Sequence, residues 1–451
     1  MKRLAMEQLD AWAASPDRKP LIVGGARQVG KTWLMREFGR TRFKRTAYIS
    51  FDNNESMPAV FEGSLSPERL LPILQIEAGC PIDGDTLLIL DEVQEVPRAL
   101  QSLKYFREEA PEIPVVAAGS SLGIALKGRR RDAPEGARRV SFPVGKVSYL
   151  DLYPLSFLEF LYADGQDMLA DAVRALDWDA LSAFHGRLNE LLRFYMYVGG
   201  MPESVLAYAG SRDLARVRGV QAELLRSYGD DFSKYAPNDL AERIRLVWRA
   251  IPPNLAKENR KFMFSKVGRS ARAREYEDAL RWLFDSSLAH EVRCVSGPEL
   301  PLASHEDEGV FKVYLHDVGL LGAMVSLDAR SLLDGDGLFS SYKGALAEQL
   351  ALQEIVASGQ AGSPHYYKNE KTHNEVDFLV DGNGAVPSAV PIEVKAGENV
   401  QAKSLAAYVK KYGPELAVRC SLRQHARSGA IEEVPLYALG AYFRTTVAGL
   451  S

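Results

Sequence analysis

The first part of the chain alternates short apolar runs with stretches of helical periodicity. Residues 99–109 are the clearest of the helical stretches. Five apolar runs have the length of strands: residues 21–24, 47–51, 86–90, 115–119 and 146–150. Apolar strands alternating with helices are typical of a mostly parallel sheet that helices cover on both faces. The pattern over residues 1–155 therefore predicts an α/β fold.

The periodicity becomes helical after residue 153. Residues 188–197 and 215–228 have helical spacing, and Gly199-Gly200-Met201-Pro202 predicts a sharp break between helices. Two more helix candidates follow at residues 243–250 and 273–285, and two strand-like runs follow these at 290–295 and 311–315. Helix, turn, helix and hairpin is the order of a winged helix.

A third pattern begins near residue 345. Residues 345–355 have helical spacing and place Glu348 on an apolar stripe. Residues 375–380 and 390–395 alternate as strands do, with Asp377 on the face opposite its apolar neighbours. Gly382-Asn383-Gly384 predicts the hairpin turn between them.

Composition places the chain among ordinary globular proteins. It has 451 residues, of which 46% are hydrophobic and 25% charged. No apolar run approaches the roughly 20 residues of a membrane helix, and charge interrupts the N-terminus too early for a signal peptide. Three scattered cysteines fit neither a disulfide framework nor a zinc knuckle. We therefore expect a cytoplasmic protein without membrane contact.

The charge is unevenly distributed. The formal net charge is −4, but residues 239–285 hold eleven Lys or Arg against seven acidic residues. This asymmetry has two interpretations. The segment is an anion-binding module, with residues 269–281 as a recognition helix on duplex DNA, or it is a solvated helix face.

One stretch of eight residues carries the strongest chemical signal. Gly25-Ala26-Arg27-Gln28-Val29-Gly30-Lys31-Thr32 is a complete G-x-x-x-x-G-K-T phosphate-binding loop between an apolar strand and a helix-competent segment. Glycines let backbone N–H groups approach a triphosphate closely. Lys31 is expected to reach the β- and γ-phosphates of ATP, and the Thr32 hydroxyl to bind Mg²⁺.

Two carboxylates end the apolar run at residues 86–90. Asp91 suits a contact to the Mg²⁺ that Thr32 binds, and Glu92 suits the group that orients the attacking water. Together with the phosphate loop, these two carboxylates predict a protein that hydrolyses ATP and does not only bind it. Ser120 follows the next apolar strand, where it either senses the γ-phosphate or forms part of a Gly-Ser turn.

A second set of chemical residues lies near the C-terminus. Asp377 and Glu393 are candidate metal ligands assisted by Glu348, and Lys395 is a candidate to position or activate water. Three carboxylates and a lysine are what Mg²⁺-dependent cleavage of a phosphodiester requires. The alternative is a salt-bridged pair of strands. His365 and His373 lack metal-ligand spacing, and we expect both at the surface.

Taken together, these motifs resemble a large prokaryotic family of AAA-like P-loop ATPases with a C-terminal domain of unknown function, DUF4143. The later motifs are the more particular to the family. The matching stretches are residues 25–32, 90–94, 119–121, 153–157, 199–202, 311–320, 375–378 and 392–395.

The resemblance implies a three-layer ATPase core, a winged-helix region and a C-terminal fold similar to PD-(D/E)xK nucleases. It carries over Lys31, Thr32, Asp91 and Glu92 as nucleotide residues, and the quartet Glu348, Asp377, Glu393 and Lys395 as nuclease-like residues. The expected divisions are a P-loop core at 1–155, a helical lid at 156–235, a winged-helix-like region at 236–330 and the nuclease-like domain at 335–451.

AAA-like relatives usually assemble into rings in which an arginine reaches the neighbouring nucleotide, so the resemblance implies a homo-oligomer. Lys146 stands where related chains often have an arginine, and lysine lacks the planar guanidinium fork. The candidate finger residues are Arg129, Arg130, Arg138 and Arg139.

The sequence thus predicts a Mg²⁺-dependent ATPase that acts on DNA through a nuclease-like domain. The alternative is a nucleotide-driven switch or remodelling ATPase. In that case the C-terminal domain is a non-catalytic scaffold that binds a protein partner.

Overall fold

This computed structural model describes most of the chain in two compact units. The N-terminal unit comprises Arg3–Tyr153 and Asp285–Ser287, and the C-terminal unit comprises Met1–Lys2, Pro154–Phe284 and Leu288–Ser451. The described residues are 1–119, 145–257, 260–268, 271–330, 340–359, 362–369, 372, 374–383, 386–397 and 403–449.

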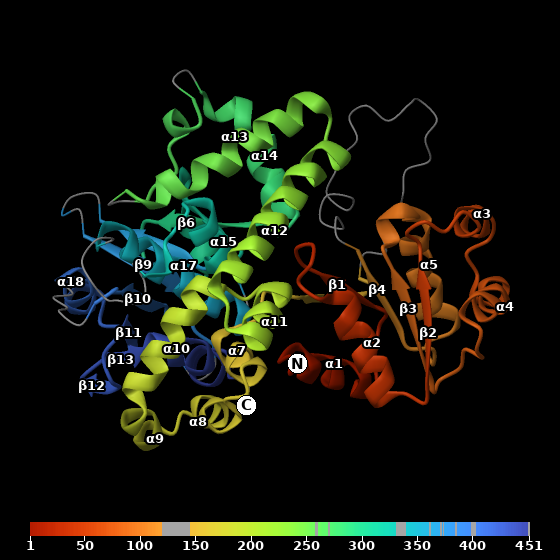
Figure 1. The fold of residues 1–451 in the computed structure, drawn as a ribbon, viewed down its shortest axis with the longest axis horizontal. Coiled ribbons are helices and arrows are strands. Elements are labelled where there is room, and N and C mark those ends of the chain that lie inside the picture. Colours follow the sequence, from red (N-terminus) through yellow and green to blue (C-terminus); the bar gives the residue numbers. More distant parts are fainter. Residues whose placement is uncertain are drawn as a thin grey trace. The chain divides into compact units, whose positions relative to one another are not determined.

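The described part of the N-terminal unit contains a five-stranded sheet in the order β2-β3-β4-β1-β5, with every pair parallel (Figure 1). The strands are β1 (Leu21–Gly24), β2 (Arg45–Ser50), β3 (Thr86–Asp91), β4 (Val115–Ala118) and β5 (Ser148–Asp151). Each apolar run of the expected core forms one of these strands. Because β1 and β3 are parallel, the phosphate loop and Asp91 emerge at the same edge of the sheet.

Helices cover both faces of this sheet. The side chains of α2 pack on one face, whereas α3, α4 and α5 share a core cluster with Ile22, Ile49 and Leu88 on the other. The helices are α1 (Ala5–Ala14), α2 (Lys31–Arg42), α3 (Met57–Glu62), α4 (Pro67–Ala78) and α5 (Pro97–Glu109), with the short turn η1 (Val93–Glu95). The predicted α/β class of the core is confirmed.

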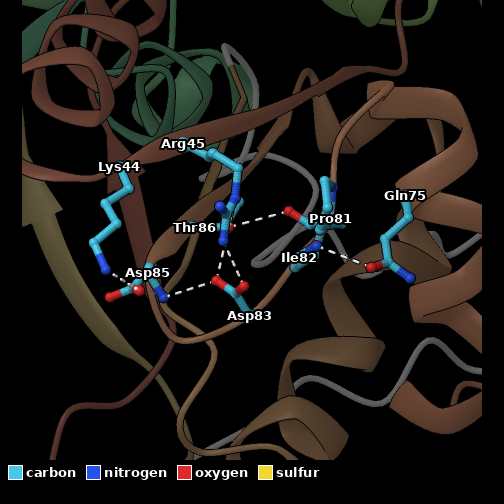
Figure 2. Close-up of polar contacts among 8 residues, drawn as sticks. All are labelled: Lys44, Arg45, Gln75, Pro81, Ile82, Asp83, Asp85 and Thr86. Atoms are coloured by element: carbon cyan, nitrogen blue, oxygen red, sulfur yellow. Dashed lines mark hydrogen bonds and ion pairs between the residues drawn. The ribbon is translucent and has the colours of Figure 1, made fainter.

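Polar contacts fix the loop that leads into β3 (Figure 2). The Asp83 carboxylate accepts hydrogen bonds from the Arg45 guanidinium at 2.5 Å and from the Thr86 hydroxyl at 3.0 Å. The Ile82 N–H donates to the Gln75 side chain at 3.0 Å. These contacts join β2, α4 and β3 at the end of β3 remote from Asp91, and so help to fix the register of the strand that carries it.

The C-terminal unit begins with a helical region, as the periodicity predicted. The Gly199-Gly200 break separates α10 from α11. The helices up to residue 285 are α7 (Phe157–Ala163), α8 (Asp167–Ala175), α9 (Trp178–Ala183), α10 (His185–Val198), α11 (Pro202–Ser211), α12 (Leu214–Tyr235), α13 (Asn238–Leu255), η2 (Phe264–Lys266) and α14 (Ala273–Asp285). The later ones are η3 (Leu302–His305), α15 (Val318–Met324), α17 (Ser340–Ala357), α18 (Lys403–Tyr412), η5 (Leu436–Ala438), α19 (Leu439–Tyr442) and η6 (Phe443–Val447).

The strands described in the C-terminal unit form one mixed eight-stranded sheet, in the order β12-β13-β11-β10-β9-β8-β6-β7 (Figure 1). They are β6 (Ala289–Val295), β7 (Glu306–Leu315), β8 (His365–Lys368), β9 (Glu375–Val380), β10 (Val390–Val394), β11 (Ala417–Ser421), β12 (Ala426–Ser428) and β13 (Ile431–Pro435). The helix α17 contacts β7 and β10, and α18 contacts β9, β10 and β11.

The hairpin expected for a winged helix is therefore part of this larger sheet. Strand β6 pairs with β7 antiparallel and with β8 in parallel, which joins the region 236–330 to the C-terminal strands. The four-part division of the chain stays a prediction, since contacts separate the described chain into two units only.

One local expectation for β9 and β10 was wrong. The strands pair antiparallel as expected, and in the connection between them the Val386 N–H donates to the Asn383 carbonyl at 2.5 Å, while Gly384 lies outside the described residues. Strict alternation fails in β9. Between the pairs His365↔Leu379 and Tyr367↔Val376, one residue of β8 opposes two residues of β9, which is the geometry of a β-bulge.

The bulge changes which side chains share a face. Val376 packs with Leu379 in one core cluster, whereas the Phe378 ring lies 5.7 Å from the Tyr314 ring. Periodicity had placed Val376 and Phe378 on the same face.

In the described part of the chain, no helix is both long and apolar enough to cross a membrane.

Candidate functional site

The phosphate loop has the backbone shape that an anion site requires. Gly25 and Gly30 have φ angles of 123° and 94°, in the region that glycine adopts readily. A Cβ atom on Gly25 would lie 2.2 Å from the Leu152 carbonyl oxygen, so close approach also demands glycine there. Gly30 is the N-cap of α2, whose first backbone N–H groups can bind phosphate oxygens.

Lys31 lies at the centre of this loop. Its Nζ donates to the carbonyl oxygens of Gly25 at 2.9 Å and Ala26 at 2.8 Å. Burial lowers the pKa of Lys31 to about 8, although Glu92 and Asp91 oppose the shift. A polyphosphate beside this ammonium would compensate for the lost hydration and favour the charged form.

Thr32 and Asp91 meet across the edge of the sheet. The Thr32 hydroxyl donates to Asp91 Oδ2 at 2.7 Å, although 59 residues separate them in sequence. The Tyr48 hydroxyl donates to the same oxygen at 3.0 Å, and the Glu92 N–H donates to Oδ1 at 3.0 Å. A hydroxyl oxygen and a fixed carboxylate at this separation fit the shared Mg²⁺ site of P-loop proteins.

Glu92 follows in an unusual backbone conformation. Its φ and ψ angles are 55° and 44°, a left-handed geometry that non-glycine residues adopt rarely. Gln94 donates from Nε2 to Glu92 Oε2 at 2.5 Å. Strain of this kind concentrates at functional positions, and here it falls on the carboxylate-bearing residue that directly follows β3.

Arg3 is a support that the sequence did not indicate. Its guanidinium donates to the Val29 carbonyl in the loop at 3.1 Å and to the Tyr153 carbonyl at 2.7 Å. The Leu152 N–H also donates to the Gly24 carbonyl at 3.0 Å. The segment that leaves β5 is thus tied to the phosphate loop.

Several candidate residues lie outside the described residues. They are Ser120, Arg129, Arg130, Arg138 and Arg139. Lys146 is described, and its Nζ forms an ion pair with Glu108 at 2.9 Å. Because Glu108 lies on α5, Lys146 forms this ion pair within the N-terminal unit.

The C-terminal quartet converges at a second centre, here called the carboxylate centre (Glu348, Glu375, Asp377, Glu393, Arg260, Lys312 and Lys395). Glu348 on α17 is 2% exposed, as its apolar stripe predicted. Its carboxylate accepts a hydrogen bond from the Tyr314 hydroxyl at 3.0 Å and pairs with the Arg260 guanidinium. Burial and the neighbouring Asp377 charge raise the pKa of Glu348, whereas the charges of Arg260 and Lys312 oppose this shift and favour the ionised carboxylate.

Asp377 and Glu393 face this centre from adjacent strands. The last β9–β10 pair in register is Ile392↔Phe378, and the Asp377 carboxylate then accepts the Val394 N–H at 2.8 Å. Glu393 pairs with Lys395 at 2.5 Å. Burial and the Asp377 charge raise the pKa of Glu393 to about 7.

These carboxylates do not have the arrangement of an open metal site. Within the described ranges, no group of three or more His, Cys, Asp or Glu residues is placed to hold a metal ion. Glu348 and Glu393 have cationic partners, and Asp377 binds a backbone N–H. Glu393 Oε2 is buried without a hydrogen-bond partner among the described atoms. The role of the quartet as metal ligands stays a prediction.

The motifs that are particular to the resemblance meet at a buried polar junction in the C-terminal unit. Asp317 accepts the Gly200 N–H at 2.6 Å and the Leu320 N–H at 2.9 Å, and the Leu155 N–H donates to the Gly200 carbonyl at 2.7 Å. Burial raises the pKa of Asp317 to about 6. These motifs therefore stabilise the packing of helices around α15.

The helix α17 takes part in both the junction and the carboxylate centre. Gln353 accepts the Val318 N–H at 2.9 Å, and Glu354 accepts the Phe157 N–H at the start of α7 at 2.7 Å. Burial raises the pKa of Glu354 to about 8. One helix thus connects the Glu348 position with the segment that follows residue 153.

Comparison with known families finds three matching regions. Residues 17–161 match the model of an AAA domain, residues 343–439 match DUF4143, and residues 189–331 match another domain of unknown function, DUF8612. The chain combines an AAA domain with a DUF4143 domain. No curated protein matches it.

Likenesses to solved structures are weak. The Walker-type ATPase PABY2304 of Pyrococcus abyssi is 15% identical, with a TM-score of 0.42 over 71% of this chain and 94% of that chain. The ORC1 protein of Aeropyrum pernix in complex with DNA is 14% identical, with a TM-score of 0.29 over 72% of this chain and 93% of that chain. C. elegans PCH-2 is 13% identical, with a TM-score of 0.21 over 38% of this chain and 47% of that chain. At these TM-scores the likenesses carry no inference about this chain.

The sequence predicted surface positions for two histidines of the DUF4143 region, His365 and His373. His365 is 3% exposed and contacts Glu306 Oε1 at 2.8 Å, so its expected surface position was wrong. The strand β8 pairs with β6 and β9 on its two sides, which buries it. His373 lies outside the described residues.

The basic segment does not form a uniformly basic face. On α14, Arg274 and Arg281 share the exposed surface with Glu275, Glu277 and Asp278. Arg260 is directed inward instead, toward Glu348. The mixed charge supports the solvated-face interpretation of this helix more than the recognition-helix one.

Proposed function

We propose that this chain binds and hydrolyses ATP with Mg²⁺, and that its nucleotide state controls the C-terminal unit. The observation that carries the proposal is the 2.7 Å hydrogen bond between Thr32 and Asp91 beside the loop around Lys31. It joins the two residues that would share Mg²⁺ at the point where the loop N–H groups would hold the phosphates.

Each residue of the AAA domain site has a distinct role in this proposal. The backbone N–H groups of residues 25–32 bind the β- and γ-phosphate oxygens, and Lys31 turns its ammonium from the loop carbonyls to those oxygens. Thr32 and Asp91 would hold Mg²⁺, which would neutralise charge on the phosphates. Glu92 would orient a water for attack on the γ-phosphorus and accept its proton, while the bond from the γ-phosphorus to the β-phosphate oxygen breaks and ADP leaves.

Covalent continuity supports the proposed link to the C-terminal unit. Leu152 lies against Gly25, and only two residues separate it from Leu155 in the polar junction. A change in loop position on binding ATP would therefore pull directly on the segment that leads to α7. Glu354 from α17 in turn accepts the Phe157 N–H at the start of α7.

The test of hydrolysis is phosphate release by the purified chain with Mg²⁺ and ATP, beside Glu92→Gln. The wild type should turn over, and the variant should bind ATP but release phosphate at least about 100-fold more slowly. Equal turnover by the two proteins would exclude the role of Glu92. Absence of turnover in the wild type would leave a nucleotide-binding switch without hydrolysis.

A second candidate function is DNA cleavage by the DUF4143 domain. The convergence of Asp377, Glu393 and Lys395 favours it. Incubation with plasmid, Mg²⁺ or Mn²⁺ and ATP, beside Lys395→Ala, decides the matter. Cleavage that the variant loses supports a nuclease, and intact plasmid with either metal supports a scaffold that binds a protein partner.

A further inference from the structure

The carboxylate centre contains two cations that the sequence did not connect with it. Arg260 comes from the segment after α13, and Lys312 comes from β7. Backbone contacts on the next two residues hold Arg260 in place. The Phe262 N–H donates to the Phe311 carbonyl at 2.9 Å, and the backbone of Lys261 forms an isolated antiparallel β-bridge with that of Lys312. A strand-like pairing beside β7 thus directs the arginine toward α17.

Arg260 occupies this place under strain. Its φ angle is 48°, a left-handed conformation that costs a non-glycine residue free energy. Its side chain is 15% exposed and forms an ion pair with Glu348, whose own side chain is 3% exposed. Strain persists only where surrounding contacts compensate for it, and here the contact is a charge pair in a dry environment.

Lys312 supplies the second internal charge. Its side chain is fully buried, its Nζ lies 2.6 Å from Glu375 Oε1, and the ammonium lies 4.6 Å from the centre of the Tyr366 ring. A buried lysine remains charged only beside anions, and the carboxylate centre provides them. The Lys312 side chain is 0% exposed, whereas that of Arg260 is 15% exposed, so only Arg260 has contact with solvent.

The charges of the centre nearly balance without any added ion. Four carboxylates (Glu348, Glu375, Asp377 and Glu393) face three cations (Arg260, Lys312 and Lys395), and a fourth cation, Lys368, has its Nζ 3.8 Å from Glu375 Oε2. In metal-dependent sites a divalent cation provides this compensation. Here side chains of the protein provide it.

We propose that Arg260 is a built-in counter-ion that takes the place of a divalent metal at Glu348, so that the carboxylate centre excludes metal. The inference does not depend on ATP hydrolysis and explains why a nuclease-like set of residues has no open metal site. If the DUF4143 domain cleaves DNA, Arg260 must first leave Glu348.

The experiment is a Mn²⁺ titration of the full-length protein without nucleotide, followed by the electron paramagnetic resonance signal of free Mn²⁺. The wild type should bind no Mn²⁺ at this centre below about 1 mM. Arg260→Gln should gain one site with an affinity about tenfold higher or more, because one nearby positive charge is gone. Adding Asp377→Asn to this variant should remove the new site.

Matched variants separate the effect of position from that of charge. Arg272→Gln removes an exposed arginine of the same segment and should behave as the wild type. Arg260→Lys keeps the charge and should also gain no site.

Two results would overturn the proposal. One is micromolar binding of Mn²⁺ by the wild type that Asp377→Asn abolishes, and this needs no Arg260 variant to fold. The other is a folded Arg260→Gln protein, verified by its circular dichroism, that binds no more Mn²⁺ than the wild type. ATP hydrolysis is measured separately, so its failure would leave this result unchanged.

Discussion

The Thr32 hydroxyl donates a 2.7 Å hydrogen bond to the Asp91 carboxylate and so joins the phosphate loop to the end of β3. Asp91 is 2% exposed and also accepts a hydrogen bond from Tyr48. The position of a bound Mg²⁺ is therefore prepared by contacts from three strands or helices. Preorganisation of this kind lowers the cost of organising charge during reaction.

Replacing Lys31 by alanine should abolish hydrolysis with little loss of fold. The Lys31 ammonium donates its hydrogen bonds to loop carbonyls, and after its removal Asp91 keeps the hydrogen bonds from Thr32 and Tyr48. We expect phosphate release to fall by about 100-fold or more. Lys44→Ala changes an exposed lysine and should keep normal turnover. Retained turnover in Lys31→Ala would refute the assignment.

Asp91→Asn should raise the Mg²⁺ concentration needed for half-maximal hydrolysis. The amide keeps the shape but loses the charge that holds the metal. Tyr48→Phe removes only one hydrogen bond to Asp91, and a net loss of about 1 kcal/mol predicts a several-fold effect. Hydrolysis rates across a Mg²⁺ series measure both. A larger effect of Tyr48→Phe than of Asp91→Asn would contradict the role of the Asp91 charge in holding the metal.

Gly200→Ala should destabilise the C-terminal unit. A Cβ atom at this position would lie 2.1 Å from the Leu155 carbonyl oxygen, and backbone cannot move away cheaply. We expect a loss of about 2 kcal/mol or more in the free energy of unfolding. Gly210→Ala, on α11 with no atom within 4 Å, should be neutral or stabilising by up to about 1 kcal/mol. Denaturant titration compares the two variants, and equal stability would contradict the close packing of the junction.

Glu354 should make the stability of the protein decrease as pH rises. Its pKa is about 8 in the folded chain and 4.5 in the reference state, so between these values the folded state holds a proton that the unfolded state has released. The loss of stability begins above pH 4.5 and is complete above about pH 8.

Glu354→Gln keeps an acceptor for the Phe157 N–H but removes the titration. Its melting temperature should fall less than that of the wild type between about pH 6 and about pH 9. Glu190→Gln, an exposed change on α10, should follow the wild type. An unchanged pH dependence in Glu354→Gln would show that Glu354 is ionised in the fold.

The residues of the proposed nucleotide site could be recognised in the sequence because the motifs that contain them are local. Glycine, lysine and threonine within residues 25–32 specify the loop, and an apolar run followed by Asp91 specifies the neighbouring strand end. The five strands of the core were predicted within a few residues for the same reason, since their apolar runs are continuous.

The carboxylate centre could be predicted only in part. Glu348, Asp377, Glu393 and Lys395 stand in helix and strand patterns that bring them together. Arg260 and Lys312 depend on β7 lying in the same sheet as β9, which no local pattern encodes. Arg260 instead contributed to the positive charge of residues 239–285 and was interpreted with that segment.

The bulge in β9 shows the limit of periodicity. Alternation assumes one residue on each strand per step, whereas at Asp377 one residue of β8 opposes two residues of β9. Beside this bulge the Asp377 carboxylate accepts the Val394 N–H, which a regular ladder would pair with a backbone carbonyl. Whether a side chain takes the place of a backbone carbonyl in such a pair of strands depends on residues that are close in space and distant in sequence.

Titration calorimetry of the wild type with Mg²⁺ and ATP, beside Lys31→Ala, measures directly whether the phosphate loop binds nucleotide. We expect saturable heat with one nucleotide per chain in the wild type and at least about tenfold weaker binding in the variant. No heat and no saturation in a folded wild-type protein would contradict the claim that the loop at residues 25–32 holds a magnesium-bound triphosphate.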